Sequence, residues 1–181
     1  IEPTPAFLKE AFLAAVPAIS QYPTVSGIPA LRKSISNYLK RRFEVTIDSE
    51  TQIIPTSGSK EAIYHLPSAF IDPHGERRGV AFLEPCYPVY RLGGLFAGAE
   101  IIKLTLRAED QFHFRPDLPG RVPKEVEDRI AILWINYPHN PTGAQMSKDS
   151  LARVATWARE RGILLASDEC YCDVHGGTPA P

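Results

Sequence analysis

From residue 52 onward, short apolar runs alternate with segments of helical periodicity, and this alternation restricts the fold more than any other feature. Strands separated by helices form βαβ units, which give a mainly parallel sheet with helices on both faces. We therefore predict an α/β fold with three αβα layers. The expected strands are 52–55, 79–83, 100–104, 129–135 and 163–166, and the expected helices are 60–70, 87–96 and 147–160.

Two more helices are expected before this alternation begins. Thr4 and Pro5 predict the N-cap and first position of a helix that ends near Val16 and Pro17. The apolar spacing in residues 29–43 predicts a second, amphipathic helix, with cations near its C-terminal end. Residues 107–124 are rich in Asp, Pro and Gly and predict a long surface excursion with at most one short helix.

Length and charge exclude several classes of protein. The chain has 181 residues, enough for one domain or for one domain with part of another, and its net charge is −1, which argues against a nucleic-acid binder. No apolar run is long enough for a membrane span, and no signal peptide is visible. Three cysteines are too few for a disulfide scaffold and predict a cytoplasmic protein, with Cys170 and Cys172 as packing thiols.

The first expected strand end is followed by a loop with the character of an anion site. In an open α/β sheet, ligands bind beyond the carboxyl ends of the strands. Residues 56–61 are small or polar and lead into a helix, so backbone N–H groups, two hydroxyls and the Lys60 ammonium would attract a phosphate. An ordinary N-cap is the alternative interpretation. Neither the Walker pattern nor GxGxxG is present.

Two further strand ends carry an aromatic side chain and amides. Tyr87 stands between two prolines and offers a rigid face for a planar ring, or simply packs at a helix start. Residues 136–143 contain two asparagines, two prolines and a glycine, so the amides could bind a ligand oxygen and an X-Pro bond could be cis. His139 in this turn either touches substrate or faces solvent.

The last expected strand ends in a carboxylate, Asp168, with a phenol, Tyr171, three residues later. Asp168 could cap the next helix, or it could keep a heterocyclic nitrogen protonated. Together the strand ends fit pyridoxal 5′-phosphate (PLP). In this interpretation the residue 57–60 loop holds the phosphate, Tyr87 covers the ring, Asn140 and Tyr171 bond the phenolic oxygen, and Asp168 pairs with the pyridinium nitrogen, making the ring an electron sink.

In these motifs and their order, the chain resembles the class I/II aminotransferases of the aspartate-aminotransferase fold. The matching segments are Tyr22 with Gly27 and Leu31-Arg32, then 57–60, 85–90, 140–143 and 168–171. The resemblance implies that Asn140, Asp168 and Tyr171 contact the cofactor, whose phosphate we expect at the loop residues Gly58, Ser59 and Lys60. It also implies a homodimer in which Tyr22 reaches the phosphate of the neighbouring subunit, with residues 1–20 in a small domain or arm and 21–181 in the PLP-binding large domain.

Two parts of the family pattern are absent from the printed sequence. The family's Schiff-base lysine lies in an S-x-S-K motif downstream of D-x-x-Y, and the arginine for the substrate carboxylate lies near its C-terminus. Residues 57–60 mimic the lysine motif but occupy the phosphate-loop position, so Lys60 is interpreted as a phosphate neighbour. We therefore expect a fragment of about half an enzyme that is inactive alone.

The resemblance implies a transaminase that moves an amino group between an amino acid and a 2-oxoacid. The 168–171 segment, the ending Thr178-Pro179-Ala180-Pro181 and the basic helix end Lys40-Arg41-Arg42 are most similar to N-succinyldiaminopimelate aminotransferases of lysine biosynthesis. A carbon–sulfur lyase of the same fold would share every residue named here. A non-catalytic aminotransferase-like sensor module is the alternative from another class.

Overall fold

The computed structural model describes residues 3–18, 20, 22, 24–175 and 180–181, which belong to two compact units, Ile1–Pro55 and Thr56–Pro181. Part of the ending used in the sequence comparison, Thr178 and Pro179, lies outside the described residues. The predicted boundary after residue 20 concerns the domains of a complete protein and stays a prediction. None of the described helices is long and apolar enough to cross a membrane.

The first unit contains both helices expected there. They are α1, Ala6–Ala15, followed by a 3₁₀ turn at Val16–Ala18, and α2, Pro29–Phe43. The N-cap of α1 is Pro5 and not Thr4, because the extended ψ of Pro5 (144°) starts the helix one residue later than predicted. On α2, the buried Arg32 forms an ion pair with Glu50 at 2.9 Å, which ties the segment after α2 to the helix.

The second unit is built on a four-stranded sheet in which every pairing is parallel, as predicted. The strand order is β2-β1-β3-β4. The strands are β1, Gly79–Glu84; β2, Glu100–Thr105; β3, Ile130–Asn136; and β4, Leu164–Asp168. The helices are α3, Ser59–Phe70; α4, Val89–Phe96; α5, Lys124–Glu127; and α6, Lys148–Glu160.

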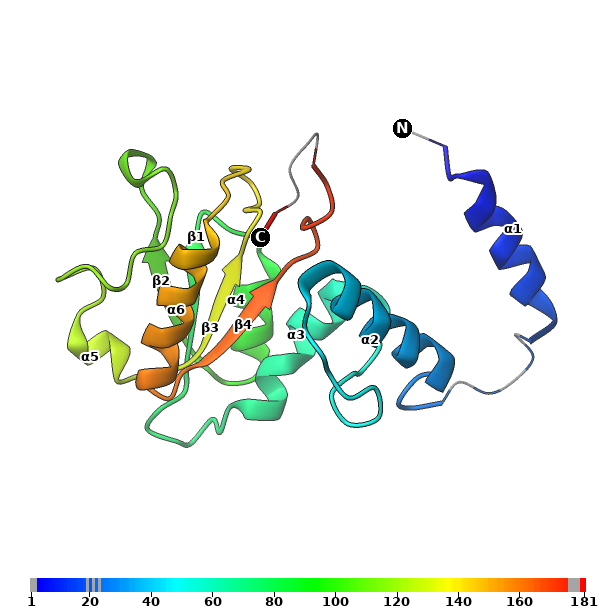
Figure 1. Ribbon diagram of the computed structural model, residues 1–181. Coiled ribbons are helices and arrows are strands. Elements are labelled where there is room, and N and C mark those ends of the chain that lie inside the picture. The colour runs from blue at the N-terminus through cyan, green and yellow to red at the C-terminus, as the bar shows by residue number, and fades with distance from the viewer. Residues whose placement is uncertain (1–2, 19, 21, 23, 176–179) are drawn as a thin grey trace. The chain divides into compact units, whose positions relative to one another are not determined.

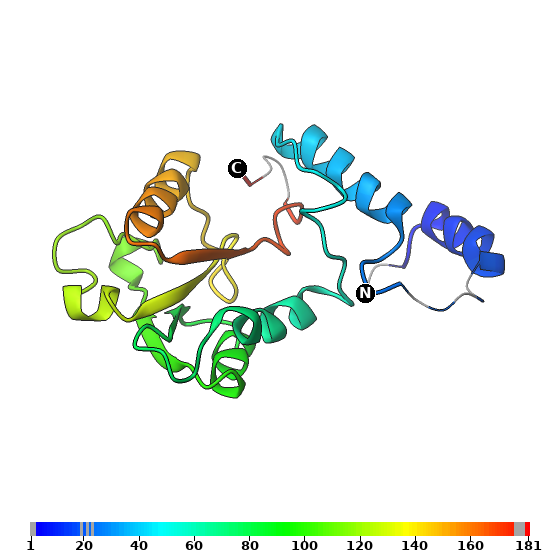
Figure 2. The same cartoon turned by 90° about the horizontal axis from the view of Figure 1, so that it is seen from below.

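Helices cover both faces of this sheet, which confirms the three-layer prediction. Figure 1 shows α6 on one face and α3 and α4 on the other, and Figure 2 shows the sheet between them. Val154 and Trp157 of α6 pack into one hydrophobic cluster, whereas Ile63 of α3 and Tyr90 of α4 pack into the other. Burial on both faces explains why β1 and β3 are almost uninterrupted apolar runs.

Two sequence-based expectations about local structure are wrong. Residues 52–55 form no strand: Pro55 has no N–H group to donate, and no described strand pairs with this run. The excursion at 107–124 is not purely a surface segment, because Phe114 and Val122 are buried in the cluster on the α6 face. Its 3₁₀ turn, Ala108–Asp110, is the short helix that the composition allowed.

Helices α3 and α4 approach each other closely at Gly93. A Cβ atom at this position would lie 2.8 Å from the backbone oxygen of Tyr64, closer than real Cβ contacts. The glycine therefore lets α4 lie against the backbone of α3, and α4 follows directly on the segment that carries Tyr87.

We expect Gly93→Ala to destabilise the full-length protein by about 1–3 kcal/mol, because α4 must shift away from α3. Denaturant unfolding measures this loss. Gly75→Ala is the milder comparison, since its Cβ would lie 3.3 Å from its nearest contact, the backbone oxygen of Asp72, and so should cost less than Gly93→Ala. Equal midpoints for the wild type and Gly93→Ala would contradict the close-packing explanation.

Candidate active site

A cavity of about 160 Å³ lies at the carboxyl ends of β1, β3 and β4, where the sequence predicted a ligand site. The predicted Ser59, Tyr87, Asn140, Asp168 and Tyr171 all line it. Tyr90, Asn136 and Cys170 complete its wall. The structure thus brings together five of the eight predicted site residues.

Gly58, Lys60 and Tyr22 do not line this cavity. Gly58 and Lys60 are exposed neighbours of Ser59 in the loop that enters α3. Gly58 has a φ of +86°, a conformation that favours glycine. Tyr22 belongs to the first unit, where its side chain is 95% exposed. The expected roles of these three residues stay predictions.

The loop before α3 forms two hydrogen bonds of its own. Thr56 donates its hydroxyl to the carbonyl oxygen of Gly58, and the N–H of Ser57 donates to the carboxylate of Glu61. The first N–H groups of any helix lack partners within the helix, so the start of α3 supplies further donors beside Ser59. The Glu61 carboxylate, in the first turn of α3, therefore occupies the Ser57 N–H, as an acidic side chain at a helix start commonly does.

Asp168 is a buried carboxylate without a counterion among the described residues. It is 7% exposed, and none of the ion pairs found there includes it. Its Oδ2 accepts the hydroxyl of Tyr90 at 2.7 Å, and its Oδ1 accepts the N–H of Cys170 at 3.3 Å. A buried carboxylate that lines a cavity favours a cationic ligand group, and a pyridinium nitrogen fits this requirement.

Tyr90 is a site residue that the sequence analysis missed. Its ring is 2% exposed and stacks on Trp134 with 5.3 Å between centroids. Burial, followed by the hydrogen bond to Asp168, raises the pKa of its phenol, so the hydroxyl stays protonated and donates. Its position three residues after Tyr87 was the signal in the sequence that could have pointed to it. Its hydrogen bond to Asp168 could not be predicted in this way, because the two residues are 78 positions apart in the chain.

Asn140 and Tyr171 line the same cavity and contact each other. The side-chain amide of Asn140 donates to the hydroxyl of Tyr171 at 3.3 Å. The hydroxyl proton of Tyr171 and the second amide proton of Asn140 stay available for a ligand oxygen. The turn that carries Asn140 contains the cis bonds Tyr137-Pro138 and Asn140-Pro141, which confirms the expectation of a cis X-Pro bond.

His139 is not a solvent-facing turn residue, and that interpretation is wrong. The side chain is 3% exposed, and its Nδ1 lies 2.7 Å from the hydroxyl of Thr142. Burial lowers the pKa of the imidazole below the ordinary 6.5, while an interaction with the backbone of Pro85 opposes this shift. The ring is therefore held neutral between the Asn140 turn and the segment that leads to Tyr87.

Cys170 is not a packing thiol as predicted, because it is exposed and lines the cavity. Although the residue as a whole is exposed, partial desolvation of its thiol and the nearby Asp168 carboxylate raise the pKa to about 11, so Cys170 remains a neutral thiol at physiological pH. Within the described residues, no group of three His, Cys, Asp or Glu side chains could hold a metal ion.

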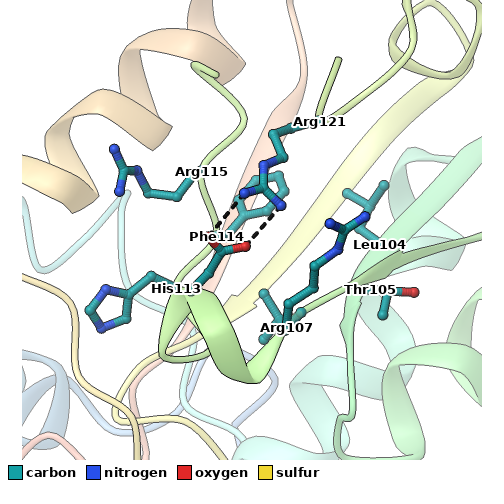
Figure 3. Close-up of a pocket in the computed structure, with 9 residues that line it drawn as sticks. Leu104, Thr105, Arg107, His113, Phe114, Arg115 and Arg121 are labelled. Carbon is teal, nitrogen blue, oxygen red and sulfur yellow. Dashed lines mark hydrogen bonds and ion pairs between the residues drawn. The ribbon is translucent and has the colours of Figure 1, made fainter. Parts of the chain in front are cut away.

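A second cavity, of about 40 Å³, lies beyond the end of β2 and has a cationic wall (Figure 3). Asp110 and Arg121 form a two-point ion pair there, with distances of 2.8 and 2.9 Å. Figure 3 shows Arg115 extending to one side of Phe114 and Arg107 to the other, so these cations do not converge on one point. This cavity contains none of the predicted site residues.

The chain is similar to known aminotransferases in sequence and in structure. The family model "Aminotransferase class I and II" matches residues 2–181. The LL-diaminopimelate aminotransferase of Aquifex aeolicus is 38% identical over 99% of this chain and 45% of its own length. The LL-diaminopimelate aminotransferase of Desulforudis audaxviator is 41% identical over 88% of this chain and 39% of its own length. The aspartate aminotransferase of Thermus thermophilus, 30% identical, superposes with a TM-score of 0.88 over 99% of this chain and 45% of its own.

We expect His139 to make folding stability pH-dependent below its unfolded pKa of about 6.5. The unfolded chain takes up a proton there that the folded chain resists, so stability is lost as the pH falls, by at most about 1.4 kcal/mol per pH unit. Unfolding midpoints between pH 8 and 5.5 should fall more steeply for the wild type than for His139→Gln. His74→Gln, at an exposed histidine, is the control. Identical slopes for the wild type and His139→Gln would contradict a neutral, buried imidazole.

The chain spans less than half the length of the curated relatives that it matches. Members of the matching family are PLP-dependent enzymes. The cavity is lined by a buried carboxylate, Asp168, and by hydroxyl and amide groups. This chain belongs to the class I and II aminotransferases.

Proposed function

We propose that the complete protein is a PLP-dependent aminotransferase that moves an amino group between an amino acid and a 2-oxoacid. The observation that carries this proposal is the convergence of Asp168, Asn140, Tyr171, Tyr87 and Ser59 on one cavity at the strand ends. The family match over residues 2–181 supports the same reaction. When bound, PLP supplies an electron-withdrawing ring that stabilises negative charge at the amino acid's α-carbon.

In this proposal, each side chain of the cavity has a distinct task. Asp168 holds the proton on the ring nitrogen, and the Tyr90 hydroxyl keeps the carboxylate oriented toward it. Asn140 and Tyr171 donate to the phenolic oxygen, whereas Tyr87 covers the ring and excludes water from its face. Ser59 and the first N–H groups of α3 bind the phosphate, with Lys60 nearby as a cation.

The substrate that we propose is an amino acid of the diaminopimelate type. Curated relatives 35–41% identical to this chain are named LL-diaminopimelate aminotransferase, and the sequence itself resembles N-succinyldiaminopimelate aminotransferases. Both names describe enzymes that act on an amino group of the diaminopimelate carbon skeleton. Assays of the full-length enzyme with each compound, with glutamate formation as readout, distinguish the two. We also propose that it acts in the cytoplasm, which is supported by three cysteines that are free thiols.

We expect Asp168→Ala in the full-length protein to bind PLP and remain coloured but to lose several kcal/mol of transition-state stabilisation, a factor of ten for each ~1.4 kcal/mol. The ring nitrogen would lose the partner that keeps it protonated. Steady-state kinetics and absorption spectra measure the two effects. Glu169→Gln is the control, because this neighbouring carboxylate is exposed and bonds Ser167 outside the cavity. Near-normal turnover of Asp168→Ala would contradict the assignment.

We further propose a homodimer in which Tyr22 contacts the phosphate held by the neighbouring subunit. The exposed phenol of Tyr22 within its own unit is compatible with such a contact. A charge-assisted hydrogen bond contributes about 1.5–3 kcal/mol, so Tyr22→Phe should weaken PLP binding roughly ten- to a hundredfold.

Mixed dimers test this shared site. Tyr22→Phe subunits are combined with Gly58→Ala subunits, whose phosphate loop is strained because Gly58 has a positive φ. One site of each mixed dimer then carries both lesions and the other carries none, so about half of the activity per dimer should return. If mixed dimers form and restore nothing, Tyr22 does not serve the neighbouring site.

A further inference from the structure

Asn136 lines the candidate site, but the proposed function assigns it no role. It is the last residue of β3, is 4% exposed and lines the cavity. In the parallel pairing of β3 with β4, its partner in register is Asp168. Its side chain therefore lies where the backbone hydrogen bonds of the two strands end.

The side-chain amide of Asn136 donates one hydrogen bond and accepts another. The Nδ2 atom of Asn136 donates to the backbone oxygen of Asp168 at 2.7 Å. The Oδ1 atom accepts the backbone N–H of Asn140 at 2.8 Å. The two residues joined in this way are 28 positions apart in the chain and come from the end of β4 and from the turn after β3.

Asparagine is well suited to this position because the bridge needs a donor and an acceptor on one short, planar group. An aspartate would keep the acceptor for Asn140 but would offer no N–H to the Asp168 carbonyl. An apolar side chain of the same size would leave a buried N–H and a buried carbonyl without partners. The hydrogen bonds are made to backbone atoms, so they fix where both side chains begin.

We propose that Asn136 is a positioning residue that sets the spacing between Asp168 and Asn140. In the proposed function these two residues bind two different positions of the ring, the nitrogen and the phenolic oxygen. Asn136 therefore fixes the geometry in which both contacts form at once. This inference rests on the proposed function.

The test uses the full-length protein with PLP and measures the pH midpoint of the bound cofactor's absorption change, together with the dissociation constant for PLP. Asn140→Ala should raise the midpoint, because a donor to the phenolic oxygen is lost. Asn136→Ser should raise it too and should weaken PLP binding about tenfold, the equivalent of ~1.4 kcal/mol. Val154→Ala, on the buried face of α6, is the control: it should lower thermal stability but leave the midpoint unchanged.

A double-mutant cycle separates positioning from general destabilisation. If Asn136 acts through Asn140, Asn136→Ser should change the midpoint little once Asn140 is alanine. Asn136→Asp keeps the acceptor for Asn140, so its effect on the midpoint should be the same in both backgrounds. It should still weaken PLP binding about tenfold, because Asp168 loses its anchor. This second variant carries the test if Asn136→Ser does not fold.

The outcomes distinguish this inference from the function on which it rests. A wild-type protein that does not bind PLP overturns both. If the wild type binds PLP and Asn140→Ala shifts the midpoint, wild-type behaviour of both Asn136 variants overturns the positioning role alone. Fully additive effects of Asn136→Ser and Asn140→Ala would overturn it as well.

Discussion

The burial of the Asp168 carboxylate is the constraint on which the rest of the site depends. A carboxylate taken out of water needs hydrogen bonds and a cation, and here the phenol of Tyr90 and the N–H of Cys170 supply only the hydrogen bonds. The Tyr90 phenol comes from α4, whose position is fixed by the close approach of Gly93 to α3. The packing of α4 against α3 thus helps to determine which atoms surround Asp168, and no described residue supplies a cation to it.

The parallel sheet explains why these residues meet. Its strands all end at one edge, so polar residues that follow β1, β3 and β4 gather there although they are distant in sequence. Asn136 then joins two of these ends through its side chain, where the backbone ladder stops. The result is a small cavity whose wall is polar toward the ligand and whose support is the apolar core on both faces of the sheet.

Local patterns predicted most of the fold and five of the residues that line the cavity, but not the contacts between them. The spacing of apolar residues predicted α2 with its correct ends, and the apolar runs predicted all four strands of the sheet. The prediction of a strand at residues 52–55 was wrong, because a strand requires a pairing partner and no local pattern reveals whether one is present. The burial of His139 and the bond from Tyr90 to Asp168 likewise depend on residues brought together only by the fold.

The most direct test of a cofactor site built around Asp168 is the ¹⁵N chemical shift of PLP labelled at its ring nitrogen and bound to the full-length protein. A buried carboxylate opposite this nitrogen should keep it protonated to a pH well above that at which the free cofactor loses the proton. A bound cofactor whose nitrogen titrates as it does in water would contradict the central role given to Asp168.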